Sequence, residues 1–131
     1  MVLNNDLAPT LADMGGAKAP SFVEGRSLKP ILSANPLASW RSAFLIEHRR
    51  YAEDTGKPAI PNYDAVRTSR YLYVEYPTTG EKELYDLGAD PYELTNLYSS
   101  ASPTLLGDLE SRLDALKSCA GETCERAEDG G

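Results

Sequence analysis

The chain has 131 residues, of which 41% are hydrophobic and 25% are charged, and its formal net charge is −7. This length and composition suit one modest globular domain with its own core. An acidic chain lacks the clustered Lys and Arg side chains that follow phosphates, which argues against nucleic acid as a partner. No apolar run approaches the roughly 20 residues that span a bilayer, so the sequence predicts no membrane partner either.

Residues 1–41 predict short helices joined by loops. The stretch "DLAPTLADM" suits a helix that Asp6 caps, with Pro9 in its first turn and Gly15 at its end. A further turn of helix is expected around residues 27–32. The apolar side chains of this segment have little of their own to pack against, so it resembles an arm cut from a larger body. They are Leu7, Leu11, Met14, Phe22, Val23, Leu28, Ile31 and Leu32.

The middle of the chain predicts an antiparallel sheet. The apolar run "SAFLIEH", residues 42–48, is typical of a buried strand, and the polar stretch 49–63 is typical of a long loop. Gly80 suits the positive φ of a tight turn between later strands. Because the connections are short, we expect a meander of hairpins. Its further strands are predicted at residues 63–70, 71–76 and 82–87.

The last predicted element is a helix with clear signals. Ser102 can cap it, Pro103 suits its first position, and a leucine stripe follows at helical spacing. The acidic, glycine-ended stretch 126–131 is predicted to be a flexible tail. The expected fold class is therefore α+β, with a small antiparallel sheet packed by a C-terminal helix and preceded by an N-terminal arm.

The two cysteines, Cys119 and Cys124, lie close together in "SCAGETC". Gly121 between them makes a small disulfide loop sterically feasible, and a disulfide would be consistent with an oxidising compartment. Free thiols are the alternative. A metal site is disfavoured because it needs further ligands and His48 is the only histidine.

The sequence contains no recognisable catalytic constellation. It has no GxSxG nucleophile elbow, no phosphate-binding loop and no HExxH motif. Its carboxylates are numerous, but no pair is spaced as a general acid and base. We therefore predict no catalytic and no metal-binding residues in this chain.

Two places at the predicted sheet could still contact a ligand. Glu47 and His48 end an apolar strand, where a sheet edge often opens onto a site, although a strand-end polar pair is the favoured interpretation. Tyr63 and Arg67 lie in "YDAVRT", where Arg67 could bind an anion in a bidentate manner. An ion pair of Arg67 with Glu47 or Glu75 is the favoured alternative.

A third place is Trp40 beside Arg41. The indole could stack on a sugar ring, although a tryptophan of the core or of a lid is the favoured interpretation.

Several stretches, taken in order, resemble the C-terminal part of sulfatases. They are "NNDLAPTLADMGG", "EGRSLKPIL", "WRSAFLIEH", "YDAVRTSRYLYVEY" and "ELYDLGADPYELTNL". The ending "LLGDLESRLDALKSCAGETC" is similar to the end of N-acetylglucosamine-6-sulfatases and bacterial arylsulfatases. The resemblance covers nearly the whole chain, and "LYDLGADPYELTNL" is its most specific part.

The resemblance implies a division into three parts. Residues 1–41 would be the end of the large α/β domain, related to alkaline phosphatase, together with a connecting arm. Residues 42–125 would be the C-terminal subdomain, and residues 126–131 the tail. The stretch "DPYELTNL" would have a structural role there. Met1 would be an internal or misassigned start, or the relic of a truncated gene.

The resemblance also implies chemistry that this chain does not carry. Sulfatases use a Cys or Ser in a Cys/Ser-X-Pro-X-Arg motif, which is converted to formylglycine, together with calcium. Neither Cys119 nor Cys124 is followed by that pattern, and the family's calcium ligands lie upstream of "DLAPTL". The chain could supply only the rim of a sulfatase cleft. The candidates for contacts to a sugar are Glu47, His48, Tyr63 and Arg67.

These expectations lead to one favoured function and two alternatives. The favoured function is the C-terminal fragment of a sulfatase that acts on sulfated sugars or aryl sulfates, inactive without the missing large domain. One alternative is a fragment of a related phosphodiesterase or phosphonate hydrolase. The other is a stand-alone module that binds sulfated carbohydrate or has a structural role. The resemblance suggests a secreted, periplasmic or lysosomal protein.

Overall fold

A computed structural model describes every residue except 21, 34–39, 51–59 and 131. Part of the predicted loop 49–63 therefore lies outside the described residues. The chain divides into two compact units. One combines residues 1–42 with residues 118–131, and the other is the continuous segment 43–117. No helix among the described residues is long and apolar enough to cross a membrane.

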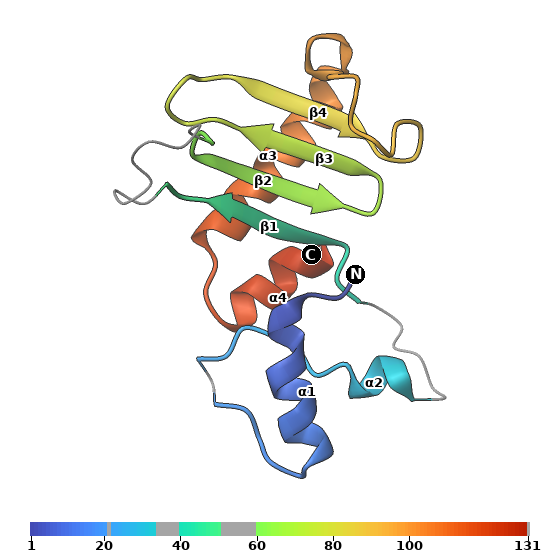
Figure 1. Cartoon of the computed structure of the whole chain (residues 1–131), viewed down its shortest axis with the longest axis vertical. Helices are drawn as coiled ribbons and strands as arrows, with labels where there is room; N and C mark the ends of the chain where they lie inside the picture. The colour runs from blue at the N-terminus through green and yellow to red at the C-terminus, as the bar shows by residue number, and fades with distance from the viewer. Residues whose placement is uncertain (21, 34–39, 51–59, 131) are drawn as a thin grey trace. The chain divides into compact units, whose positions relative to one another are not determined.

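The continuous unit is built on a four-stranded antiparallel sheet with the strand order β1-β2-β3-β4 (Figure 1). Each strand pairs with its neighbour in sequence, as a meander requires. This confirms the predicted sheet. β1, at the edge of the sheet, is mostly half-buried rather than buried as predicted. The strands are β1 Ala43–His48, β2 Tyr63–Thr68, β3 Tyr71–Glu75 and β4 Lys82–Asp86.

The hairpin turns follow from the residues that form them. Gly80 has a φ of +75°, as the turn between β3 and β4 was predicted to need. Between β2 and β3, the Thr68 hydroxyl accepts hydrogen bonds from the backbone N–H groups of Arg70 and Tyr71, at 3.2 and 2.7 Å. β2 therefore ends at Thr68 and is shorter than predicted.

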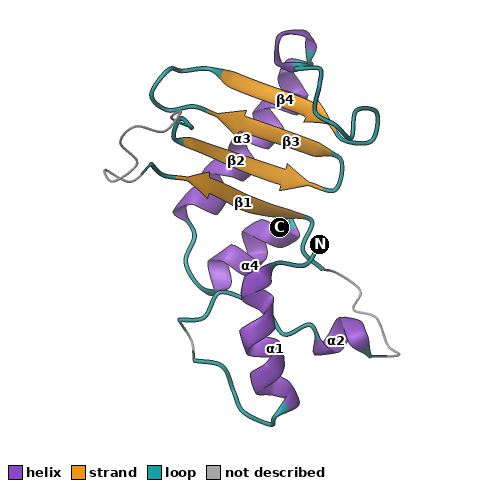
Figure 2. Ribbon diagram, in the orientation of Figure 1, coloured by secondary structure: helices purple, strands orange, loops and turns teal. Residues whose placement is uncertain are grey.

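Helix α3, Pro103–Ser118, crosses one face of the sheet (Figure 2). The backbone N–H of Leu105 donates to the Ser102 hydroxyl at 3.3 Å, which confirms the predicted cap. The buried side chains of the stripe are Leu109, Leu113 and Leu116. With the buried strand residues they form the core of this unit, which includes Val66, Tyr73 and Leu84.

Polar contacts fix α3 to the sheet around Tyr73. The Tyr73 hydroxyl lies within hydrogen-bond distance of two carboxylates, Glu75 at 2.8 Å and Glu110 of α3 at 3.0 Å, and its one proton can serve either. The Lys82 ammonium reaches Glu110 at 2.7 Å and Glu75 at 3.0 Å. Burial and the neighbouring Glu75 raise the pKa of Tyr73, and the hydrogen bond from Lys82 lowers the pKa of Glu110. The helix is therefore held by a charged network as well as by leucines.

The segment after β4 returns partly to the sheet. The backbone N–H of Leu97 donates to Leu84 at 2.8 Å, and Tyr98 in the short helix η2, Tyr98–Ser100, stacks on Tyr73 with 6.4 Å between ring centres. The prediction that Leu97 and Tyr98 fold back is confirmed. The same prediction is wrong for Leu94, which is 81% exposed.

The other unit consists of short helices and loops. They are η1 Asn4–Asp6, α1 Leu7–Met14, α2 Lys29–Leu32 and α4 Glu122–Asp129. The predicted helices 6–14 and 27–32 are thus confirmed within a residue or two. The apolar stripe of α1 is exposed, since Leu7, Leu11 and Met14 show 56%, 70% and 56% of their surface. Phe22 and Leu32 are exposed as well.

Asp6 has a different role from the predicted one. It lies at the N-terminus of α1, but its side chain makes no capping hydrogen bond to the helix. Instead its buried carboxylate forms a bidentate pair with Arg41, at 2.7 and 3.0 Å. It also accepts backbone N–H bonds from Leu3 and Arg26. Asp6 is therefore an anchor of the N-terminal segment rather than a helix cap.

Helix α4 brings the predicted tail into this unit. Glu128 accepts hydrogen bonds from Arg41 at 2.7 Å and from Arg26 at 2.8 Å, and Asp129 accepts one from Arg26 at 2.7 Å. Residues 126–129 are therefore helical, with Glu128 and Asp129 paired, and the flexibility of the tail stays a prediction. The division at residues 41 and 42 into an arm and a subdomain stays a prediction.

Candidate functional site

The face of the sheet opposite α3 is open and mostly apolar and aromatic. Side chains alternate along each strand, so every second residue points away from the helix. The strand register then places residues of all four strands on this open face. They are Phe44, Ile46, His48, Tyr63, Ala65, Arg67, Leu72, Val74, Glu83 and Tyr85.

A hollow of about 270 Å³ lies on this open face. Its apolar lining includes Ala65 and Val74, which are nearly fully buried. Around them stand tyrosine rings and two carboxylates. The full lining is Ile46, Tyr63, Ala65, Leu72, Val74, Tyr76, Glu83, Tyr85 and Glu93.

Glu93 enters this lining from the turn after β4. Its φ of +56° is the only positive value of a non-glycine residue among the described residues. The Asp90 carboxylate holds the turn by accepting the backbone N–H groups of Leu94 and Thr95, both at 2.7 Å. Such a backbone is strained, so the surrounding structure must hold Glu93 in place.

The carboxylate of Glu83 lies among tyrosine hydroxyls. Tyr76 donates to it at 3.3 Å. Burial, together with the negative charge of Glu83, raises the pKa of Tyr76 and of Tyr85. Both hydroxyls therefore stay protonated at neutral pH and can donate hydrogen bonds.

The structure brings three of the four predicted site residues to one face. His48 and Tyr63 are register partners, and their rings stack with 5.5 Å between centres. Tyr63 also lines the hollow, and Arg67 shares its face. Glu47 lies on the opposite face, where its carboxylate pairs with Arg49 at 3.1 Å. The sugar-binding role of Glu47, His48, Tyr63 and Arg67 stays a prediction.

Arg67 has an acidic partner, but not a predicted one. Its guanidinium approaches Glu93 at 3.9 Å, whereas Glu47 or Glu75 was expected. Glu75 lies on the other face of the sheet and pairs with Lys82. The predicted partners were wrong because the turn that carries Glu93 folds back toward β2.

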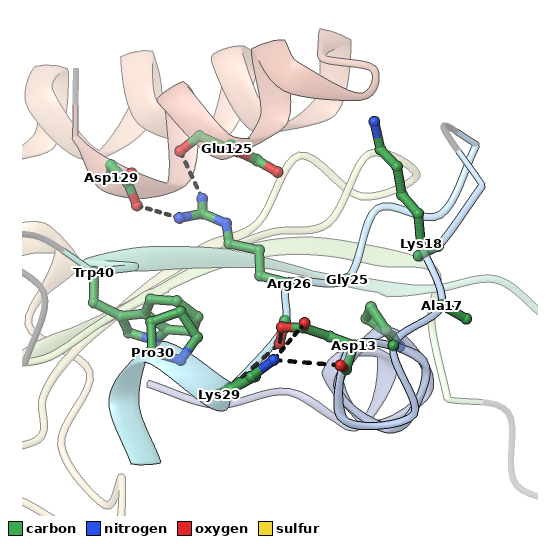
Figure 3. Close-up of a pocket in the computed structure, with 14 residues that line it drawn as sticks. Asp13, Ala17, Lys18, Gly25, Arg26, Lys29, Pro30, Trp40, Glu125 and Asp129 are labelled. Atoms are coloured by element: carbon green, nitrogen blue, oxygen red, sulfur yellow. Dashed lines mark hydrogen bonds and ion pairs between the residues drawn. The ribbon is translucent and has the colours of Figure 1, made fainter. Parts of the chain in front are cut away.

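A second cleft, of about 780 Å³, lies within the unit of short helices (Figure 3). On one side, Lys29 pairs with Asp13 at 3.0 Å. On the other, Arg26 reaches Asp129 and the backbone carbonyl of Glu125, both at 2.7 Å. These charged groups of the cleft walls form ion pairs and hydrogen bonds with other groups of the same unit. They therefore stabilise the unit.

Trp40 at the edge of this cleft is held by the protein itself. Its indole N–H donates to the backbone carbonyl of Met1 at 2.6 Å. The guanidinium groups of Arg26 and Arg41 lie 5.7 and 5.8 Å from the ring centre. These contacts favour the structural interpretation of Trp40 over a sugar-stacking one.

Comparison with known proteins then places the chain. Residues 1–118 match the family model described as "N-sulphoglucosamine sulphohydrolase, C-terminal". The chain belongs to this sulfatase C-terminal family. The N-acetylglucosamine-6-sulfatase of Capra hircus is 31% identical to it over 95% of the chain, and the chain covers only 27% of that relative.

Solved structures agree with the family assignment. BT4656, solved with its substrate D-glucosamine-2-N,6-O-disulfate, superposes with a TM-score of 0.77 at 26% identity, over 95% of this chain and 25% of that one. The phosphonate monoester hydrolase of Agrobacterium radiobacter superposes with a TM-score of 0.65 at 31% identity, over 86% of this chain and 24% of that one. The predicted family resemblance and the α+β fold are thereby confirmed.

The cysteines of this sulfatase C-terminal chain form a disulfide. Cys119 and Cys124 are bonded to each other, with 4.9 Å between their Cα atoms. This confirms the disulfide and removes both thiols as free nucleophiles or metal ligands.

The described residues do not fit the calcium and formylglycine of intact sulfatases. Among them, no group of three or more His, Cys, Asp or Glu side chains could hold a metal ion. Cys119 and Cys124 are bonded to each other, so neither offers a free thiol for conversion to formylglycine.

Sequence reasoning missed most of the hollow. Tyr76, Glu83 and Tyr85 lie on the open face by simple strand alternation, so that pattern could have identified them. Glu93 had no comparable signal, because a positive φ at glutamate is not predictable from its neighbours in sequence.

Proposed function

We propose that this chain is the C-terminal part of a sulfatase acting on sulfated sugars or aryl sulfates, and that it is inactive without the large domain. The observation that carries the proposal is the family match over residues 1–118, although the chain covers only 27% of the goat relative. The remainder of such a relative is long enough to hold a separate catalytic domain.

The exposed apolar surface supports this proposal. Leu7, Leu11 and Met14 of α1 and the side chains of Phe22 and Leu32 are well exposed. Clustered apolar side chains at a surface are typical of contact with another protein part. We infer that this surface packs against the large domain.

A phosphonate monoester hydrolase is the second candidate. It is favoured by the superposition on the Agrobacterium enzyme, at a TM-score of 0.65 and 31% identity. The two candidates differ in the ester that the intact protein cleaves. A stand-alone module that binds sulfated carbohydrate is the third, since the open face of the sheet carries a hollow with aromatic rings.

A chimera tests the proposal. Residues 1–131 replace the corresponding C-terminal part of the goat N-acetylglucosamine-6-sulfatase, and a version cut before that part serves as control. The substrates are N-acetylglucosamine 6-sulfate, p-nitrophenyl sulfate and a phenyl phosphonate monoester. We expect sulfate release by the chimera, and none by the truncated control or by the 131-residue chain alone.

The remaining outcomes separate the alternatives. A chimera that cleaves only the phosphonate ester would favour the second candidate. Sulfate release by the 131-residue chain alone would contradict the proposed inactivity. A chain that is monomeric, stable to heating and unable to restore activity would favour the stand-alone module.

A further inference from the structure

The hollow on the open face has the three chemical features of a sugar-binding site. Its lining includes Ala65 and Val74, which are buried and apolar. Aromatic rings of Tyr63, Tyr76 and Tyr85 stand beside them. The third feature is a pair of polar groups, the carboxylates of Glu83 and Glu93. In sugar-binding sites, aromatic faces pack against the C–H face of a pyranose and polar groups at the rim fix its orientation.

The charges of the hollow favour hydroxyl groups over sulfate. Glu83 and Glu93 contribute carboxylates, which accept hydrogen bonds and donate none. A sugar hydroxyl would donate to them. A sulfate ester in the same place would bring a third negative charge against the two carboxylates, and like charges at such range repel. Arg67, at 3.9 Å from Glu93, offsets only one of these two charges.

The turn that carries Glu93 holds this residue at the hollow. Glu93 holds a left-handed backbone conformation that costs a non-glycine residue free energy, whereas glycine would adopt it freely. The two hydrogen bonds of Asp90 fix the turn. The turn therefore does not depend on a glutamate side chain at position 93. Strained residues of this kind cluster at ligand sites.

The size of the hollow suits a single ring. At about 270 Å³ it is smaller than the pockets that take drug-sized molecules, which begin at about 300 Å³. Such a space accepts one monosaccharide rather than a longer saccharide.

Resting on the proposed function, we propose that the hollow on the open sheet face binds an unsulfated sugar ring of the saccharide whose sulfated ring is the substrate. The tyrosine rings stack on the pyranose, and Glu83 and Glu93 accept its hydroxyl protons. The hollow thus recognises the sugar ring next to the sulfated ring, and this unsulfated ring lies away from the ester that is cleaved.

The test uses the 131-residue chain and two probes, N-acetylglucosamine and N-acetylglucosamine 6-sulfate. Each is titrated into the ¹⁵N-labelled chain while amide shifts are followed by NMR. We expect saturable shifts at Tyr85, Glu93 and Leu94 with the unsulfated sugar, and weaker binding of the sulfated one. Because binding is measured without turnover, a failed hydrolysis assay of the chimera leaves this result standing.

The decisive variant is Glu93→Gly. Glycine adopts the φ of +56° without strain, so the turn should survive while the carboxylate is lost. Retained protection of the Leu94 and Thr95 amides, which donate to Asp90, from hydrogen exchange in the free protein would show that the turn is intact. Loss of a hydrogen bond to a charged group predicts affinity weaker by about tenfold or more.

A matched control variant is Asp108→Asn, which removes an exposed carboxylate from α3 on the other face of the sheet. It should bind the sugar as the unmodified chain does. Three results would each overturn the proposal: no saturable shift at the hollow, equal affinity in Glu93→Gly, or preference for the sulfated sugar.

Discussion

The side chain of Asp6 anchors the N-terminal segment of the chain. Its carboxylate is fully buried and receives both guanidinium N–H groups of Arg41 and two backbone N–H groups. Arg41 in turn reaches Glu128 of α4. A buried pair of this kind costs desolvation, and its removal on one side leaves the other charge unpaired.

We predict that Asp6→Asn lowers the free energy of unfolding by about 3 kcal/mol, because Arg41 then stays buried with part of its charge uncompensated. The measurement is urea denaturation followed by circular dichroism. The control is Asp13→Asn, whose surface pair with Lys29 should contribute little. Equal midpoints for the two variants would contradict the anchoring role of Asp6.

The same carboxylate predicts a dependence on pH. Burial alone would raise the pKa of Asp6, but hydrogen bonds from Arg41 and from the backbone N–H groups of Arg26 and Leu3 outweigh it, so the pKa lies below its ordinary 3.8. The stabilisation is therefore present above that ordinary value and is lost as pH falls through the lowered pKa. The difference in urea midpoint between the unmodified chain and Asp6→Asn should shrink in acid. A constant difference from pH 6 to pH 2 would argue against it.

Gly25 gives a third prediction at this scale. A Cβ at this position would lie 2.0 Å from the backbone carbonyl oxygen of Asn5 and 2.5 Å from its carbon. Backbone atoms cannot move aside as the end of a flexible side chain can. We expect Gly25→Ala to destabilise the unit of short helices by about 1–3 kcal/mol. Gly107→Ala, which meets nothing within 4 Å, is the control for the thermal melt.

These residues show what local patterns cannot predict. The sequence spacing around Asp6 indicates a helix start, and α1 does begin there, but the partners Arg26 and Arg41 lie 20 and 35 residues away. Glu93 and Arg67 likewise meet only because the turn after β4 folds back. Contacts at such separation depend on the tertiary fold and leave no period in the sequence.

At the scale of elements, prediction succeeded where a strong period exists. The strands are short runs bounded by turn residues, and α3 carries a leucine stripe on its buried face, so both kinds of element leave a clear signal. Helix α4 was missed because "ETCERAED" carries no such stripe. Its stability comes instead from ion pairs with Arg26 and Arg41 and from the disulfide at its start.

The short loop that the disulfide closes allows its contribution to stability to be predicted. Cys119 and Cys124 are five positions apart, and closing so short a loop stabilises the folded state by about 2 kcal/mol in the chain-entropy model. The double variant Cys119→Ser, Cys124→Ser should lose about that amount in urea denaturation. Adding a reductant should destabilise the unmodified chain and leave the double variant unchanged. An identical midpoint for both proteins would show that the disulfide is not needed.

At the scale of the whole chain, the short-helix unit exposes several large apolar side chains. Leu7, Leu11 and Met14 lie on α1 and are each more than half exposed. The sequence predicted this imbalance correctly from the number of apolar residues with nothing to cover them. The pattern of exposed residues does not by itself identify a partner, and the large domain is proposed as that partner on the family resemblance.

We predict that the triple variant Leu7→Gln, Leu11→Gln, Met14→Gln keeps its thermal stability, because glutamine favours helix and these side chains are exposed. It should also associate less with itself at high concentration, as measured by sedimentation velocity. In the chimera it should reduce sulfate release. A large fall in melting temperature would instead mean that these side chains pack within the chain.

The way in which each unit is assembled along the chain has a consequence for its synthesis. The sheet joins only neighbours in sequence, so each hairpin can close as soon as its second strand has emerged from the ribosome. The other unit must wait, because Arg26 pairs with Asp129, 103 positions later. We expect the sheet to be folded on the ribosome while the first forty or so residues are still exposed to chaperones and proteases. Helix α4 then completes this unit through its pairs with Arg26 and Arg41.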